Sequence, residues 1–137
     1  MSDAEEQIEE AVEPSFPTWF PDGCPPNNTS NDASEEVYRI VKTIPLAEAD
    51  FLSHFELGTA VNAPSCARCG VSVFDSLSNA MHRQRLSPRL GEFVAKGKLE
   101  STDGKTGDLN TKSGHLTWWP YFGVVRRVRF EEPVKCL

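Results

Sequence analysis

The chain of 137 residues has no apolar run long enough to cross a membrane as a helix. Its first residues are acidic, whereas those of a secretory signal are basic. We therefore expect a cytoplasmic protein without a membrane segment. In that reducing compartment the four cysteines are expected to remain thiols. The two glycosylation sequons, which begin at Asn27 and Asn28, are then expected to stay unmodified.

Lysine and arginine are absent from the first 36 residues, which hold ten of the 20 acidic residues. The remaining 101 residues carry the other ten acids and all 14 bases, a net charge of +4. Acidic and proline-rich segments bury too little apolar surface to fold. We predict a disordered acidic arm over 1–35 and a single domain over 36–137. The apolar patch at 15–26, SFPTWFPDGCPP, is expected to dock on the domain or on a partner.

Several short motifs are also missing. The chain has no G-x-S-x-G, no P-loop and no dinucleotide-binding glycine pattern, which disfavours a serine hydrolase of that type and an NTPase. Cys66-Ala-Arg-Cys69 is half of a zinc site, but no second CxxC supplies the other two ligands. We expect ordinary thiols in preference to zinc. If zinc binds, Cys66 and Cys69 are its predicted ligands.

The hydrophobic pattern predicts an α+β fold, with a small mixed or antiparallel sheet of about five strands and two helices. The expected strands cover 37–44, 70–74, 92–99, 115–119 and 124–130. The expected helices cover 46–57 and 75–86. The fourteen polar residues at 100–113 show no period, so we expect a long loop there.

Two adjacent tryptophans stand in the strand at 115–119. Alternation places Trp118 with Leu116, and Trp119 with His115 and Thr117 on the opposite face. Both faces of the sheet must then be covered. A helix or the arm is the preferred cover for the second ring, and a bound ligand is the alternative.

Arg39 shares a strand face with Val37 and Val41. Burying an arginine there is costly unless the guanidinium meets an anion. Two interpretations stay open, an ion pair with a carboxylate of the protein and a clamp for the phosphate or carboxylate of a ligand.

Three segments occur in an order found in a known family. Tyr38-Arg39, GVSVFDSLSNA at 70–80 and GEFVAKGKL at 91–99 resemble the core of small ADP-ribosyltransferase-like domains. The resemblance implies NAD as cofactor. Arg39 would hold its pyrophosphate or ribose, Ser72 would brace the nicotinamide side, and Tyr38 or Trp119 would stack on it.

The same resemblance implies a glutamate late in the chain that polarises the ribose hydroxyl. Glu131 is the candidate, with Glu132 and Glu92 as alternatives, and none of the three stands in a matching motif. The chain also resembles bacterial proteins of unknown function with a DFLSH-type helix and a late H-x-T-W-W, which implies no activity.

Basic residues form a further candidate site, in or just after the second expected helix and in the last expected strand, where Arg127 and Arg129 would share a face. They are His82, Arg83, Arg85, Arg89, Arg126, Arg127 and Arg129. With Trp118 and Trp119 they could form a groove for nucleic acid. A solvated basic face is the preferred interpretation, because +4 is a modest charge for that role.

His115 is either a strand-end histidine with a satisfied hydrogen bond or a general acid/base. Taken together, the sequence favours an interaction module, a non-enzymatic domain that binds a partner protein through its aromatic strand (Trp118, Trp119) and acidic arm, with Arg127 as a further binding residue. The alternative is an NAD-binding domain that uses Arg39, Ser72, His115 and Glu131.

Overall fold

The computed structural model describes residues 14–30 and 35–136. Within them the chain forms one antiparallel sheet of six strands in the order β4-β5-β2-β1-β3-β6. The strands are β1 (Glu35–Val41), β2 (Val71–Phe74), β3 (Phe93–Leu99), β4 (Gly104–Gly107), β5 (His115–Pro120) and β6 (Val134–Lys135). The α-helices are α2 (His54–Leu57), α3 (Ser65–Arg68) and α4 (Leu77–Leu86). Three 3₁₀ turns accompany them, η1 (Glu48–Phe51), η2 (Pro88–Leu90) and η3 (Arg126–Arg129).

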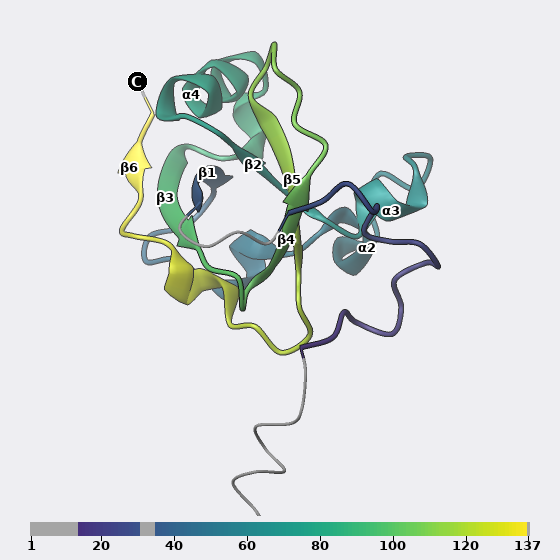
Figure 1. Ribbon diagram of the computed structural model, residues 1–137. Helices are drawn as coiled ribbons and strands as arrows, with labels where there is room; N and C mark the ends of the chain where they lie inside the picture. The colour runs from purple at the N-terminus through teal and green to yellow at the C-terminus, as the bar shows by residue number, and fades with distance from the viewer. Residues whose placement is uncertain (1–13, 31–34, 137) are drawn as a thin grey trace, which may run out of the picture.

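The predicted α+β class is confirmed, although the sheet has six strands in place of five. Figure 1 shows a curled sheet that runs from β6 at the left to β5 and β4 at the right. The helix α4 packs against β1, β2 and β3, and the two single-turn helices α2 and α3 lie beyond β5 in this view. Both faces of the sheet are covered, each by a cluster of buried side chains.

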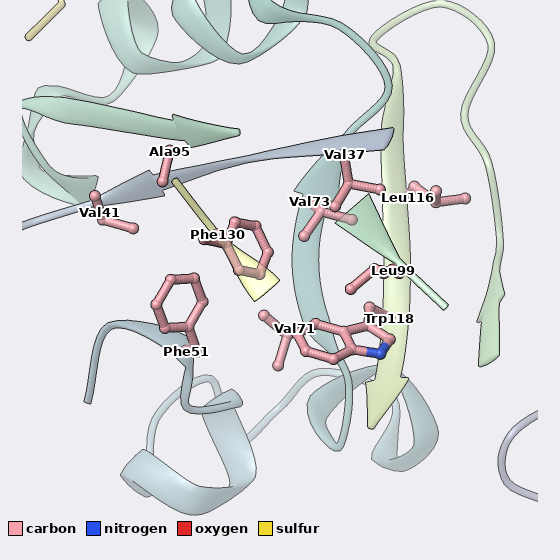
Figure 2. Close-up of a cluster of buried hydrophobic side chains, with 10 residues drawn as sticks. All are labelled: Val37, Val41, Phe51, Val71, Val73, Ala95, Leu99, Leu116, Trp118 and Phe130. Atoms are coloured by element: carbon pink, nitrogen blue, oxygen red, sulfur yellow. The ribbon is translucent and has the colours of Figure 1, made fainter. Parts of the chain in front are cut away.

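The main core lies on the concave face, where the strands contribute alternate residues. It holds Val37, Val41, Phe51, Val71, Val73, Ala95, Leu99, Leu116, Trp118 and Phe130. Figure 2 shows Phe51, which comes from η1, pointing toward Phe130, with ring centroids 4.5 Å apart. A smaller cluster of Ile40, Phe74, Val94 and Ala80 lies between the sheet and α4. The predicted alternation along β5 holds, since Leu116 and Trp118 share the main core.

The predicted helix over 46–57 is wrong, because the chain breaks at Leu52 and Ser53. Both residues are extended, and the short α2 begins only after them. The Ser53 hydroxyl accepts a hydrogen bond from the Glu56 N–H at 3.2 Å, and the Glu56 carboxylate accepts one from the Ser53 N–H at 2.8 Å. This capping box starts a new helix where the periodicity predicts a continuous one.

The break also has a packing reason. In one continuous helix Phe51 and Phe55 would share a face. Instead Phe51 is fully buried in the main core, whereas Phe55 is 41% exposed and stacks on Trp19 with centroids 4.6 Å apart. Two separate aromatic contacts thus replace one helical stripe.

The predicted loop at 100–113 contains β4, which pairs with β5. Its sequence, GKTG, lacks apolar alternation because glycine is required where the Trp119 backbone and ring approach. A Cβ on Gly104, which has φ +137°, would lie 2.1 Å from the Trp119 carbonyl oxygen, and Gly107 lies next to the Trp119 ring. Tertiary contact therefore produces this strand, and propensity does not.

The predicted strand at 124–130 is also wrong, because the segment forms η3. The Glu48 carboxylate accepts hydrogen bonds from the N–H groups of Arg126 and Arg127, at 2.9 and 3.2 Å. A helical turn brings residues three apart onto one side. Ion pairs of Arg126 with Glu56 and of Arg129 with Asp103 then outweigh the strand propensity of the local valines.

The arm is packed on the domain over residues 14–30, so the disorder predicted over 1–35 is wrong for that stretch. The predicted disorder of 1–13 and 31–34 lies outside the described residues. A disulfide joins Cys24 to Cys66, so the expected reduced state is wrong for these two cysteines. Ser30 forms a bridge to Thr106 of β4. Disulfides are typical of oxidising compartments, so the cysteines give the predicted cytoplasmic location no support.

The aromatic patch of the arm docks on the domain, as one of the two sequence-based alternatives predicted. Phe16 contacts Tyr121 with ring centroids 4.7 Å apart, and Trp19 stacks on Phe55. These rings cover part of the domain surface next to α2 and the end of β5.

Candidate functional site: a cationic cleft between two strands

A cleft opens where β1 and β2 diverge. These strands are paired at a single position, Tyr38 with Phe74. Continuing that register would place Ile40 opposite Ser72. The structure instead leaves a cleft of about 1030 Å³ there, lined by residues of both strands together with α2, α4 and the loop before β5.

The lining is strongly basic. Its charged and titratable members are Arg39, Lys42, His54, His82, Arg83, Arg89, Lys112 and His115. No aspartate or glutamate is among the described residues that line it. Five permanent positive charges around one cleft, with no lining carboxylate to neutralise them, create a positive potential that concentrates anions.

Arg39 links β1 and β2 beside this divergence. Its Nε donates to the Asp50 carbonyl oxygen at 2.9 Å, and its Nη1 donates to the Ser72 carbonyl oxygen at 2.7 Å. The bond to Ser72 uses a main-chain acceptor of β2, so the Arg39 side chain links the two strands where their backbones do not pair. Burial lowers the pKa of Arg39 to about 10, with Asp50 opposing and Arg126 adding to the shift. The guanidinium remains charged at neutral pH.

Neither sequence-based interpretation of Arg39 describes these bonds fully. The two hydrogen bonds go to main-chain carbonyls, and Asp50 acts on the guanidinium through its charge. The Asp50 carboxylate instead accepts from the Lys42 N–H at 3.0 Å and from the Ala47 N–H at 3.2 Å. Arg39 thus links β1 to β2 and to η1 and adds charge to the wall of the cleft.

Ser72 and His115 form a hydrogen-bonded pair inside the cleft. They lie on neighbouring strands, since Ser72 pairs with Thr117 and His115 with Phe74, and alternation places both side chains on one face. His115 Nε2 lies 2.9 Å from Ser72 Oγ. The Phe74 ring meets the imidazole edge-on, with centroids 5.6 Å apart. The pair is therefore held by the sheet register.

The imidazole of His115 is a weaker base than a free histidine. Burial, which is the largest cause, and the nearby charges of Arg83 and Arg39 lower its pKa, and Asp108 opposes them. The lowered pKa favours the neutral form of His115 at pH 7. In that state one ring nitrogen accepts a hydrogen bond, so Nε2 can accept the Ser72 hydroxyl proton.

Five of the predicted catalytic and ligand-binding residues lie outside this cleft. Trp118 and Trp119 are fully buried, Tyr38 packs against the smaller cluster, and the guanidinium of Arg127 lies 3.8 Å from the Glu48 carboxylate. Glu131 is exposed, and its N–H donates to the Lys96 carbonyl oxygen. Of the predicted catalytic residues, Arg39, Ser72 and His115 are brought together and Glu131 is not.

Trp119 is covered by protein and not by a ligand. Its Nε1 donates to the Cys66 carbonyl oxygen at 2.9 Å, and Thr29 of the arm and Trp119 flank Gly107. This is the cover that the sequence analysis preferred for the second ring.

The predicted zinc pair is not available. Cys66 is bound to Cys24, and Cys69 is a buried thiol whose pKa is raised mainly by desolvation. Across 14–30 and 35–136, no three His, Cys, Asp or Glu side chains form a group that could hold a metal ion.

The basic constellation divides into two groups with different roles. His82, Arg83 and Arg89 line the cleft. Arg126 and Arg129 are ion-paired with Glu56 and Asp103 elsewhere in the fold, and no strand face joins them to Arg127. The groove with the tryptophans, which was the less favoured alternative, does not form, because both tryptophan rings are fully buried.

Sequence reasoning missed Lys42, His54 and Lys112 as members of one site. They belong to three different segments, the residue after β1, α2 and the loop before β5, and no motif spacing in the sequence links them. The one available signal was the excess of positive charge after residue 36.

Comparisons with protein-family models, curated proteins and solved structures find no match to this chain. In the described part of the chain no helix has the length and apolar character needed to span a membrane. The geometry of the cleft is thus the basis for a functional assignment.

Proposed function

We propose that the protein binds a phosphate-bearing ligand of nucleotide size in the cleft between β1 and β2. The observation that carries this proposal is the lining, which has five lysines and arginines and no carboxylate. The volume of about 1030 Å³ is at the upper end of ligand pockets in proteins. Arginines suit phosphate because their donors match two of its oxygens.

NAD is the specific ligand that the resemblance to ADP-ribosyltransferase-like domains suggests. Support comes from Arg39 and Ser72, which line the same cleft. Transfer of ADP-ribose, however, would need a carboxylate at the ribose, and Glu131, Glu132 and Glu92 are not among the lining residues. We therefore propose binding of a phosphate ligand and not ADP-ribosyl transfer.

The first test compares ligands that differ by their phosphates. Thermal shift and calorimetry with NAD, nicotinamide mononucleotide and nicotinamide riboside should give binding for the first two and little for the third. Binding of the two phosphate-bearing ligands should weaken as the salt concentration rises, because salt screens the positive charges of the cleft. Equal responses to the mononucleotide and the riboside would contradict the proposal.

A matched pair of variants localises the binding. Arg83 and Arg85 both lie on α4 and are exposed, but only Arg83 lines the cleft. Arg83→Ala should raise the Kd for nicotinamide mononucleotide by about 10-fold, equivalent to one charge-assisted hydrogen bond of about 1.5 kcal/mol. Arg85→Ala should leave Kd unchanged. Equal effects of the two substitutions on Kd would show that the ligand binds outside the cleft.

Binding of a partner protein is our second proposal. The aromatic strand cannot carry it, because Trp118 and Trp119 are fully buried. The apolar patch of the arm is occupied by Tyr121 and Phe55. Partner binding would depend on the acidic residues of the arm, of which Asp22 is exposed and those in 1–13 lie outside the described residues. The cleft is the better supported site.

A further inference from the structure

We propose that Ser72 and His115 are a nucleophile and its general base, and that they hydrolyse a phosphoester of the ligand in the cleft. This inference rests on the proposed function, because it needs a phosphate bound beside the pair. It adds a reaction class, phosphoester hydrolysis through a phosphoserine intermediate, and assigns a catalytic role to each of the two residues.

The geometry of the pair is that of an activated serine. A nucleophile and its base are typically 2.6–3.2 Å apart, and Ser72 Oγ and His115 Nε2 are 2.9 Å apart. Both side chains are partly exposed, and both line the cleft. The antiparallel ladder of β2 and β5 fixes their spacing, so the pair is preorganised without a ligand.

The charge around the pair selects the reaction. Glycosyl transfer passes through a cationic, oxocarbenium-like transition state, which a cleft of lysines and arginines would oppose. Phosphoryl transfer spreads negative charge over the equatorial oxygens of phosphorus, and cations stabilise that charge. Arg39 donates to the Ser72 carbonyl, and both Arg83 and Arg39 act electrostatically on His115. The same surroundings keep the imidazole neutral and able to accept a proton.

The reaction balances as two displacements. Ser72 Oγ attacks phosphorus and its proton passes to His115 Nε2, while the bond from phosphorus to the leaving oxygen breaks and that oxygen takes the proton from the imidazolium. Water then attacks the phosphoserine, giving a proton to His115. The Oγ–P bond breaks, and Ser72 recovers the proton. One water is consumed for each ester cleaved, and nothing is oxidised or reduced.

The test uses the full chain with two synthetic esters, bis(p-nitrophenyl) phosphate and p-nitrophenyl phosphate, which separate diester from monoester activity. The wild type should release nitrophenolate from at least one of them. Ser72→Ala and His115→Gln should each reduce kcat by at least about 100-fold, the lower end of the effect of a positioned proton acceptor. Ser101→Ala, an exposed serine outside the cleft lining, should retain wild-type turnover.

The intermediate gives an independent readout. Acid-quenched wild-type protein should carry a phosphoryl group that peptide mapping places on Ser72, and His115→Gln should lower its yield. Ser72→Cys, which preserves the size of the side chain, serves if Ser72→Ala lowers the melting temperature. Turnover by Ser72→Ala with loss in His115→Gln would overturn the nucleophile assignment and leave Ser72 as a positioning residue.

The two proposals fail in different ways. If nicotinamide mononucleotide binds but neither ester is cleaved, the catalytic inference is wrong and the binding function stands. If the protein cleaves p-nitrophenyl acetate and neither phosphate ester, the pair catalyses carboxylic ester hydrolysis and the phosphoester assignment is wrong. If no phosphate compound binds or reacts, both proposals are wrong.

Discussion

Arg126 is the residue on which the C-terminal segment depends. Its side chain is 10% exposed and meets Glu56 through two hydrogen bonds of 2.7 and 3.0 Å. Its Nη1 also donates to the Phe51 carbonyl oxygen at 2.7 Å. One guanidinium therefore joins η3 to both η1 and α2, at sequence separations of 75 and 70 residues.

Replacing Arg126 by methionine should destabilise the fold strongly. Arg126→Met leaves the Glu56 carboxylate and the Phe51 carbonyl without this donor, and removing one partner of a buried pair costs about 3–5 kcal/mol. Arg127→Met is the control, because Arg127 is half-exposed and pairs with Glu48 at 3.8 Å, a contact that contributes about 0–1 kcal/mol. Urea unfolding gives the free energy of unfolding of each variant. Similar decreases of that free energy in the two variants would contradict this account.

At the scale of elements, short pieces are held by long-range contacts. The helices α2 and α3 have four residues each, too few to be stable alone. The disulfide from Cys24 to Cys66 attaches the arm to α3, and the Cys66 carbonyl accepts from Trp119. The arm, α3 and β5 thus stabilise one another.

Loss of the disulfide should lower stability without removing the sheet. Cys24 and Cys66 are 42 residues apart, and closing a loop of that length in the unfolded chain corresponds to about 4 kcal/mol in the chain-entropy model. Cys66→Ser should therefore lower the melting temperature, and a reductant should lower that of the wild type to a similar value. Cys136→Ser, which removes a free and partly exposed thiol, should have little effect. A wild-type melting temperature insensitive to reductant would exclude a stabilising disulfide.

At the scale of the whole molecule, two groups make the fold less stable in acid. The folded-state pKa of His115 is lowered from 6.5, mainly by burial and by Arg83, with Arg39 contributing and Asp108 opposing. Burial would raise the pKa of Glu56, but hydrogen bonds from Arg126 and Ser53 lower it below 4.5 overall. For both groups the unfolded chain binds more protons than the folded chain as pH falls, so stability is lost.

The pH profile of thermal unfolding should show these two stages. The contribution of His115 is fully present above pH 6.5 and decreases as the pH falls below that value, and the contribution of Glu56 is lost below pH 4.5. His115→Gln should remove the first stage and keep the second. Melting temperatures from pH 8 to pH 4 test this, and an unchanged first stage in His115→Gln would assign it to another group.

The fold was predictable where local pattern and tertiary environment agree. The strands at 70–74, 92–99 and 115–119 match β2, β3 and β5 closely, because β-branched and aromatic residues alternate there and both faces of the sheet are covered. The failures have one cause. The segments 46–57, 100–113 and 124–130 take their conformations from distant partners, namely the core site of Phe51, the Trp119 strand and the carboxylate of Glu48.

The same division holds for the site. Residue type and the two-residue period of a strand were enough to predict that Arg39 needs polar partners, that the domain after residue 36 is basic, and that Trp118 and Trp119 face opposite sides. The separation of β1 and β2 after a single pair, which gathers five cations in the cleft that Ser72 and His115 line, follows from the tertiary fold. The reason is physical: a cleft is a relation between surfaces distant in the chain, and its charge is a sum that no local pattern records.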